Sequence, residues 1–123
     1  MASKSKLLVA IPAYNCERQI GRVLSKFDKD VQGLIDTVMV VDNQSLDKTV
    51  ENAIECSKSL KNVNFLVWQN AQNYGLGGSQ KLAFNYAQKN GYTGLVILHG
   101  DDQADIRDAL AALRGFESFG GDC

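Results

Sequence analysis

The stretch LLVAIPAYN, residues 7–15, decides the fold of this chain. It is a continuous apolar run from Leu7 to Ile11, which a proline and polar, turn-forming residues then close. Thr37 to Val41 and Leu95 to Leu98 are equally continuous, and Val63 to Trp68 is a fourth apolar run. Continuous rather than alternating runs are typical of strands that are buried on both faces of a parallel sheet.

Helical patterns lie between these runs. Apolar residues recur at three- and four-residue spacings over Glu17 to Phe27 and over Asp47 to Leu60. A third helix is expected to begin near Gly78, and a fourth is expected from Ile106 to Phe116. Strand alternating with helix predicts βαβ units with right-handed crossovers, and therefore an α/β, Rossmann-like domain of three αβα layers around a mainly parallel sheet.

Composition excludes several classes of protein. The 123 residues carry a formal net charge of -1 and are 45% hydrophobic, which favours one folded domain over disorder and over bulk capture of nucleic acid. Cys16, Cys56 and Cys123 follow no metal-binding spacing and are interpreted as free thiols in a reducing compartment. No apolar run has the length of a signal peptide or of a membrane span, so this length of chain is expected to be cytoplasmic.

Four polar segments follow the carboxyl ends of the expected strands. They are Ala13 to Asn15, Asp42 to Ser45, Gln69 to Ser79 and His99 to Gln103. In an open α/β sheet, ligands bind in the crevice beyond the carboxyl ends of the strands. The sequence therefore predicts one ligand site to which all four segments contribute.

The first two segments fit a nucleoside, although each also has a structural interpretation. Tyr14 could offer an aromatic face to a flat base, but the residues around it also suit an ordinary turn. Asp42, at the end of an apolar strand, could accept hydrogen bonds from a base. Asp47 is interpreted as a helix N-cap, and Asp105 as the N-cap of the fourth helix.

The third and fourth segments fit a diphosphate and a metal ion. The glycines of Asn73 to Ser79 allow close backbone approach, and Lys81 is expected in the first turn of the helix, where a phosphate would explain a cation. A structural turn is the alternative, since the loop is neither a Walker P-loop nor a G-x-G-x-x-G fingerprint. His99, Asp101 and Asp102 suit Mg²⁺ or Mn²⁺, and an acidic turn before the next helix remains the alternative for Asp102.

Together these segments resemble the family-2 glycosyltransferases of the GT-A fold, such as the dolichol-phosphate mannose synthases. The matching stretches, in the family's order and spacing, are VAIPAYNCERQIGRVL, VMVVDNQSLDKTVE, NAQNYGLGGSQKLAFNYA and LVILHGDDQAD. The resemblance implies a nucleoside diphosphate sugar, UDP- or GDP-linked, as the ligand and a divalent metal, Mn or Mg, as the cofactor. It implies metal ligation by Asp101 and by His99, which stands where the family has its first aspartate. The residues expected to bind the nucleotide are Pro12, Ala13, Tyr14, Asn15, Glu17, Asp42, Asn43, Gly75, Gly78, Lys81 and Asp102.

The chain departs from the family's pattern at several positions. Cys16 replaces a glutamate, Asp42-Asn43 replaces a pair of aspartates, and Ile106 replaces a proline. Ser79-Gln80-Lys81 stands where many relatives have Ala-Arg-Asn, so Lys81 would have to substitute for a diphosphate-binding arginine.

The family's catalytic domain is about twice as long as this chain. Residues 1–123 are therefore expected to form the N-terminal donor-binding part of an incomplete GT-A domain, inactive by itself, with the general base beyond Cys123. The resemblance implies an inverting transfer to an unidentified acceptor such as a lipid phosphate or a glycan. It leaves open a membrane anchor beyond the chain's end and self-association through an exposed sheet edge. A nucleotide-binding module without chemistry, or an unrelated receiver- or flavodoxin-type domain, is the alternative.

Overall fold

A four-stranded, entirely parallel sheet forms the centre of the molecule, with the strand order β3-β2-β1-β4. The computed structural model describes residues 6–101 and 105–111, so Asp102 and the expected helix end at Phe116 lie outside the described residues. The strands are β1 (Leu7–Ala13), β2 (Thr37–Asp42), β3 (Asn64–Gln69) and β4 (Gly94–Ile97). The four strands are those expected from the apolar runs, within a residue or two at each end.

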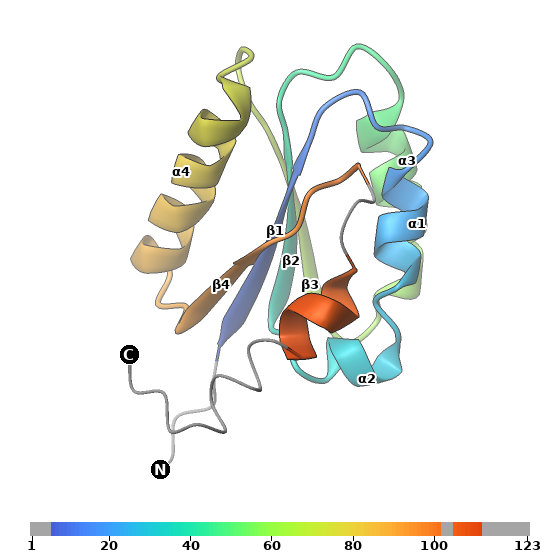
Figure 1. Cartoon of the computed structure of the whole chain (residues 1–123), viewed down its shortest axis with the longest axis vertical. Coiled ribbons are helices and arrows are strands. Elements are labelled where there is room, and N and C mark those ends of the chain that lie inside the picture. The colour runs from blue at the N-terminus through green and yellow to red at the C-terminus, as the bar shows by residue number, and fades with distance from the viewer. Residues whose placement is uncertain (1–5, 102–104, 112–123) are drawn as a thin grey trace.

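Helices cover both faces of the sheet (Figure 1). They are α1 (Ile20–Ser25), α2 (Lys29–Gln32), α3 (Thr49–Cys56) with a 3-10 turn η1 (Ser57–Ser59), and α4 (Gly75–Lys89); residues 106–111 are also helical. In Figure 1, α1 and α3 lie on one side of the sheet and α4 on the other. This confirms the three-layer αβα architecture. No helix within residues 6–101 and 105–111 combines the length and the apolarity that crossing a bilayer requires.

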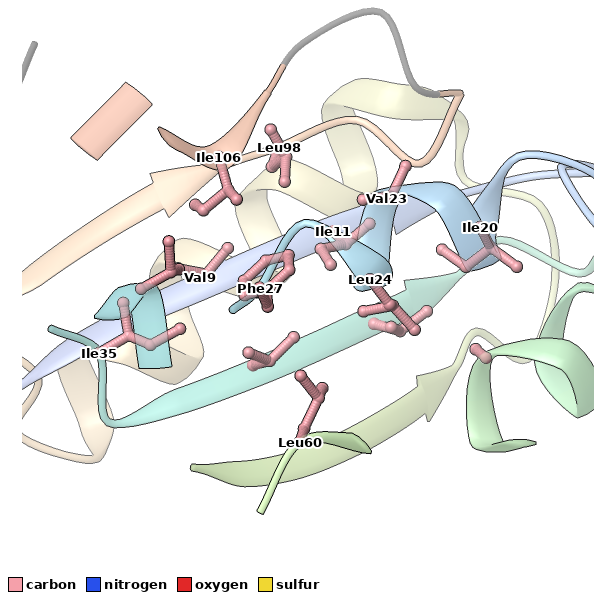
Figure 2. Packing of buried hydrophobic residues seen from close by; sticks show 14 of the residues in the cluster. Val9, Ile11, Ile20, Val23, Leu24, Phe27, Ile35, Leu60, Leu98 and Ile106 are labelled. Carbon is pink, nitrogen blue, oxygen red and sulfur yellow. The ribbon is translucent and has the colours of Figure 1, made fainter. Parts of the chain in front are cut away.

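The strand side chains alternate between two apolar clusters. Val9 and Ile11 of β1 face α1 and α3, where they pack with Leu24 and Phe27 (Figure 2). Leu8 faces the opposite way and packs with Met39, Val41 and Ala87 beneath α4. Since every residue of β1 and β2 is buried, these strands read as continuous apolar runs, as expected for the middle of a parallel sheet. β4 is only half-buried, because it forms an edge of the described sheet.

The order of the strands creates a topological switch point beside β1. The chain first moves outward from β1 to β2 and β3, and then α4 carries it back across the sheet to β4, on the other side of β1. Because βαβ crossovers are right-handed, reversing the direction of travel places α4 on the face opposite to α1 and α3. The switch point therefore lies between β1 and β4, and ligands bind at the carboxyl edge of such a point in folds of this kind.

Several helix and strand boundaries differ from the sequence-based expectation; α3, for example, spans Thr49–Cys56 within the range Asp47 to Leu60. α1 begins at Ile20 rather than Glu17, and the short helix α2 was not predicted. β1 does not end at Pro12: the strand continues to Ala13, because the proline lacks only its N–H and its carbonyl still accepts a bond from the Gly100 amide at 3.0 Å. α4 begins at Gly75 rather than Gly78.

The two expected caps have different outcomes. Asp105 accepts a 2.8 Å hydrogen bond from the Arg107 amide at the start of helix 106–111, as an N-cap does, and hydrogen bonding to Arg107 lowers its pKa to about 2. Asp47 is not the N-cap of α3, because that position is Lys48. Its carboxylate instead accepts hydrogen bonds from Thr49 and from the Glu17 amide, which ties the start of α3 to the start of α1.

Replacing Leu24 with alanine tests the packing of α1 on the sheet. Leu24 is fully buried in the larger cluster, so Leu24→Ala is expected to lower the free energy of unfolding by about 2–5 kcal/mol in urea titrations. Ile54→Ala, on the neighbouring α3, is the matched control, because Ile54 is 49% exposed and should cost less than about 1 kcal/mol. Equal losses in the two variants would contradict the described core.

Candidate functional site

A cleft of about 320 Å³ opens at the carboxyl edge of the sheet. It lies at the switch point, beyond the carboxyl ends of β1 and β4, and α4 begins at its side. Its lining comes from all four polar segments: Pro12, Ala13, Tyr14, Cys16, Asn43, Asn73, Gly75, Leu76, Ser79, His99, Gly100 and Asp101. The convergence expected from the strand ends is therefore present in the structure.

Gly100 brings the segment after β4 against the end of β1. The amides of Leu98 and Gly100 donate to the carbonyls of Ala10 and Pro12, which extends the pairing of the two strands beyond β4 itself. A Cβ atom on Gly100 would lie 3.1 Å from Cys16 Sγ and 3.2 Å from the Pro12 carbonyl oxygen, so the residue must be small. As a result His99 and Asp101 line the same cleft as Tyr14.

Tyr14 and Asn15 form the turn that follows β1. Tyr14 is 49% exposed and lines the cleft, as expected for an aromatic side chain lifted from the end of the strand. Asn15 has a φ of 47°, which asparagine tolerates better than most residues. Its side-chain oxygen accepts a 2.8 Å bond from the Leu46 amide, and its own amide donates to Ser45 Oγ. Asn15 thus joins the first loop to the second and does not line the cleft.

Asp42 is fully buried at the end of β2 and does not line the cleft. Its carboxylate accepts hydrogen bonds from the amide and hydroxyl of Ser45 and from Gln69 Nε2. These bonds compensate part of the cost of burying a carboxylate and fix the turn that follows β2. The structure therefore gives Asp42 a role in shaping the loop after β2 rather than an exposed position on the cleft wall.

Asn43 connects the end of β2 to the loop before α4. Its Oδ1 accepts from the Tyr74 amide at 2.8 Å and from Asn70 Nδ2 at 3.0 Å, and its Nδ2 donates to Asn73 Oδ1 at 2.8 Å. Asn70 also donates to Ser79 Oγ at 3.2 Å. This network spans about 30 residues of sequence separation and holds the start of α4 beside the cleft.

α4 presents only one of its sides to the cleft. Gly75, Leu76 and Ser79 line it, and they share one face at the helical repeat. Lys81 follows Ser79 by two residues, about 200° around the helix, and it lines a different pocket together with Gly78. Because α4 begins at Gly75, Lys81 lies in the second turn and not, as expected from the sequence, in the first.

Two residues after the first turn have mainly structural contacts. Cys16 is buried, burial raises the pKa of its thiol above the ordinary value, and its amide donates to Thr49 Oγ1. Its sulfur reaches the cleft beside Gly100. Glu17 accepts from the Lys48 amide at 3.4 Å and does not line the cleft.

The charge of the cleft suits a divalent cation together with an anionic ligand. Its lining, taken over the residues that the structure describes, contains Asp101 and no lysine or arginine. A diphosphate held there would need a cation, and a carboxylate beside an imidazole is a suitable pair of protein donors for Mn²⁺ or Mg²⁺. In the described part of the chain, no group of three or more His, Cys, Asp or Glu side chains could hold a metal by itself, so ligand oxygens or water would complete the coordination.

The structure thus brings together seven of the residues expected from the sequence and separates others. Asn15, Glu17 and Asp42 lie behind the cleft wall, and Gly78 and Lys81 lie on the far side of α4. The seven that line the cleft are Pro12, Ala13, Tyr14, Asn43, Gly75, His99 and Asp101.

The sequence-based set also missed lining residues, which are Cys16, Asn73, Leu76, Ser79 and Gly100. Had the third helix been expected to start at Gly75, the helical repeat would have put Leu76 and Ser79 on the same face as Gly75, and so in the cleft lining. Gly100 could have been recognised as a position of close approach between two strand ends.

The comparisons with known proteins agree with this geometry. The family model for glycosyl transferase family 2 matches residues 8–118. No curated protein matches the chain in a sequence search. Among solved structures, S. aureus TarS 1-349 in complex with UDP is similar with a TM-score of 0.69 and 24% identity, over 92% of this chain and 32% of that chain.

Two further structures show the same similarity of fold. Mannosyltransferase PcManGT from Pyrobaculum calidifontis, in complex with GDP-Man and Mn²⁺, gives a TM-score of 0.73 at 22% identity, over 93% of this chain and 33% of that one. Glucosyl-3-phosphoglycerate synthase from Mycobacterium tuberculosis, in complex with Mn²⁺, UDP and glucosyl-3-phosphoglycerate, gives a TM-score of 0.57 at 23% identity. The similarity covers 78% of this chain and 33% of that chain. The fold is therefore of the GT-A type, and the chain spans about a third of the length of these structures.

Replacing Asn43 tests the network that positions α4. Asn43→Ala leaves Asn70 Nδ2 and the Tyr74 amide without their acceptor, and we expect it to lower the free energy of unfolding by about 1–3 kcal/mol. Asn43→Asp keeps that acceptor but places a carboxylate oxygen against Asn73 Oδ1 in a buried position, so it should also lower the free energy of unfolding. Identical urea midpoints for wild type and Asn43→Ala would contradict a structural role for the network.

A methyl group at Gly100 tests the close approach of the two cleft walls. Gly100→Ala is expected to lower the free energy of unfolding by about 1–3 kcal/mol, because Cys16 and the Pro12 carbonyl must move. Gly77→Ala is the matched control: nothing lies within 4 Å of its Cβ position on α4, so alanine should stabilise the helix by about 0.5–1 kcal/mol. Parallel denaturant titrations should show a lower free energy of unfolding for Gly100→Ala and a higher one for Gly77→Ala. An unchanged free energy of unfolding in Gly100→Ala would argue against the described contact.

Proposed function

The chain belongs to glycosyl transferase family 2, and on that premise we propose that residues 1–123 supply the donor site of an enzyme that transfers a sugar from a nucleoside diphosphate sugar. The observation that carries the proposal is the convergence of four strand-end segments on one cleft at the switch point beside β1. The matched structures bound to UDP or to GDP-Man support a nucleotide as the ligand.

The nucleoside would lie at the β1 and β2 side of the cleft. Tyr14 is half-exposed there and offers a ring face on which a base can stack. Asp42, buried behind the cleft wall, would act on the nucleoside end by fixing the turn after β2 through Ser45 and Gln69. Asn15 and Glu17 would act by holding the loops that shape this end of the cleft.

The diphosphate would lie between the start of α4 and the segment after β4. Backbone N–H groups at the start of a helix favour anions, and Gly75 with its φ of 76° opens α4 at the cleft. His99 and Asp101 would hold a divalent ion, which would neutralise the leaving diphosphate as the sugar is transferred. Asp102, the next residue along the chain, would contribute to binding the nucleotide. Gly78 and Lys81 are not part of this proposed donor site, because they line another pocket.

The transfer itself would be an inverting displacement. An acceptor hydroxyl or phosphate that attacks the anomeric carbon directly reverses its configuration, and a carboxylate supplied from outside the cleft would remove the proton.

Calorimetric titration of the chain with UDP and GDP, with and without MnCl₂, tests the donor site. We expect one site whose affinity rises with Mn²⁺, and Asp101→Ala should weaken the Mn²⁺-dependent binding at least about tenfold. Asp30→Ala is the matched control, because Asp30 is exposed on α2, away from the cleft, and should leave binding unchanged. Binding that is indifferent both to Mn²⁺ and to Asp101 would overturn the assignment.

A further inference from the structure

A second pocket of about 600 Å³ lies on the α4 side of the sheet, between α4 and the edge strand β3. It is separate from the cleft described above, since the two share no lining residue. Its walls are Trp68 of β3, Tyr74 before α4, and the α4 residues and C-cap that face β3: Gly78, Lys81, Leu82, Asn85, Tyr86, Lys89 and Asn90.

The helical residues of this pocket form two parallel rows. Gly78, Leu82 and Tyr86 recur every four residues and form the floor. A second row with the same four-residue spacing consists of Lys81, Asn85 and Lys89 and forms a polar rim. Its first two members directly precede Leu82 and Tyr86 in the sequence. Position 78 of the floor accommodates only glycine without a shift of the backbone, because a Cβ there would lie 2.5 Å from Tyr74 Cβ.

The opposite wall is an aromatic surface that the fold leaves uncovered. Trp68 pairs with Val41 and therefore faces the same side of the sheet as the cluster beneath α4. α4, however, packs mainly against β1, β4 and β2, so Trp68 remains 48% exposed beside it, and Tyr74 is 49% exposed. A large pocket with aromatic walls and a few polar groups is the usual form of a ligand site.

The rim offers two ammonium groups, those of Lys81 and Lys89. Among the residues that the structure describes, neither lysine side chain forms an ion pair or a hydrogen bond, and no acidic residue lines the pocket. Lys6 adds a further charge at the Asn90 end, where its ammonium group lies 4.4 Å from the centre of the Tyr92 ring and donates to the Asn90 carbonyl. The local potential is therefore positive in a chain whose formal net charge is -1.

We propose that this pocket binds an acidic oligosaccharide, with a sugar ring against Trp68 and Tyr74 and its anionic groups at Lys81 and Lys89. The aromatic faces match the C–H face of a sugar ring, and the amides of Asn85 and Asn90 lie beside the floor to receive hydroxyl groups. The proposal does not depend on the donor site, because the two pockets share no residue.

The spacing of the charges favours an oligosaccharide over a single phosphate or a lipid headgroup. Lys81 and Lys89 are eight residues apart on α4, which is about 12 Å along the helix axis. One phosphate held at either lysine leaves the other unused, whereas charges repeated along a chain of sugars can meet both. A lipid surface would require a broader apolar face than one bordered by two amides and two ammonium groups.

The intrinsic fluorescence of the chain provides a direct test, because Trp68 is its single tryptophan. We expect trigalacturonic acid to change the Trp68 emission saturably, with an affinity that falls as salt is raised, while neutral maltotriose and inorganic phosphate bind at least fivefold more weakly. Lys89→Gln should weaken trigalacturonate binding about two- to fivefold, as expected for one exposed charge. Lys61→Gln, an exposed lysine outside this pocket, is the matched control and should have no effect.

Several results would overturn the proposal. If trigalacturonate produces neither a change in Trp68 emission nor calorimetric heat, the site is excluded. If maltotriose binds as tightly as trigalacturonate, an acidic ligand is excluded. A response only to phosphatidylglycerol vesicles would assign the surface to a membrane, and a response that follows protein concentration would assign it to a second copy. UDP and GDP titrations with MnCl₂ on the same sample report on the other cleft, so failure of either proposal is recognised separately.

Discussion

Pairing of β1 with a parallel strand on each side is the interaction on which the rest of the structure depends. β1 lies between β2 and β4, and none of its side chains is exposed. The ladder continues beyond the strands themselves, with the Asn43 amide donating to Ala13 on one side and the Gly100 amide donating to Pro12 on the other. Polar segments that follow these strands therefore meet at one edge of the sheet.

Hydrogen bonds between loops, rather than apolar contacts, give this edge its shape. Asn15 joins the first loop to the second, Asp42 fixes the turn after β2, and Asn43 holds the start of α4. Each such bond contributes only about 0.5–1.5 kcal/mol net, but leaving a buried partner unsatisfied costs more. The loops therefore behave as a connected unit, which is what a preformed ligand site requires.

α4 divides the surface of the molecule into two chemically different sites. One side of the helix lines the cleft with Gly75, Leu76 and Ser79, and the other side lines the second pocket with lysines, an asparagine and a tyrosine. A ligand in the cleft needs an added cation, because the described lining has an aspartate and no basic side chain. A ligand in the second pocket meets cations that the protein already supplies. As proposed, the two sides would bind different anions without competing for the same residues.

The sequence by itself determined the strands, their alternation with helices, and the positions of the polar segments at the strand ends. Burial on both faces of a parallel sheet leaves a local signal, since every residue of LLVAI and VMVV must be apolar. The same reasoning placed Tyr14, His99 and Asp101 at one site, because the carboxyl ends of parallel strands lie at the same edge of a sheet.

Only the tertiary structure decided which residues of each segment face the cleft. The rotation of α4 depends on where the helix begins, and a shift from Gly78 to Gly75 moves Lys81 from the expected site to the opposite side. Asp42 and Asn43 adjoin in sequence, yet one is buried beneath Ser45 and the other lines the cleft, because successive residues at the end of a strand point in opposite directions. The partners of Asn43 lie about 30 residues away, and such contacts leave no periodic signal in the sequence.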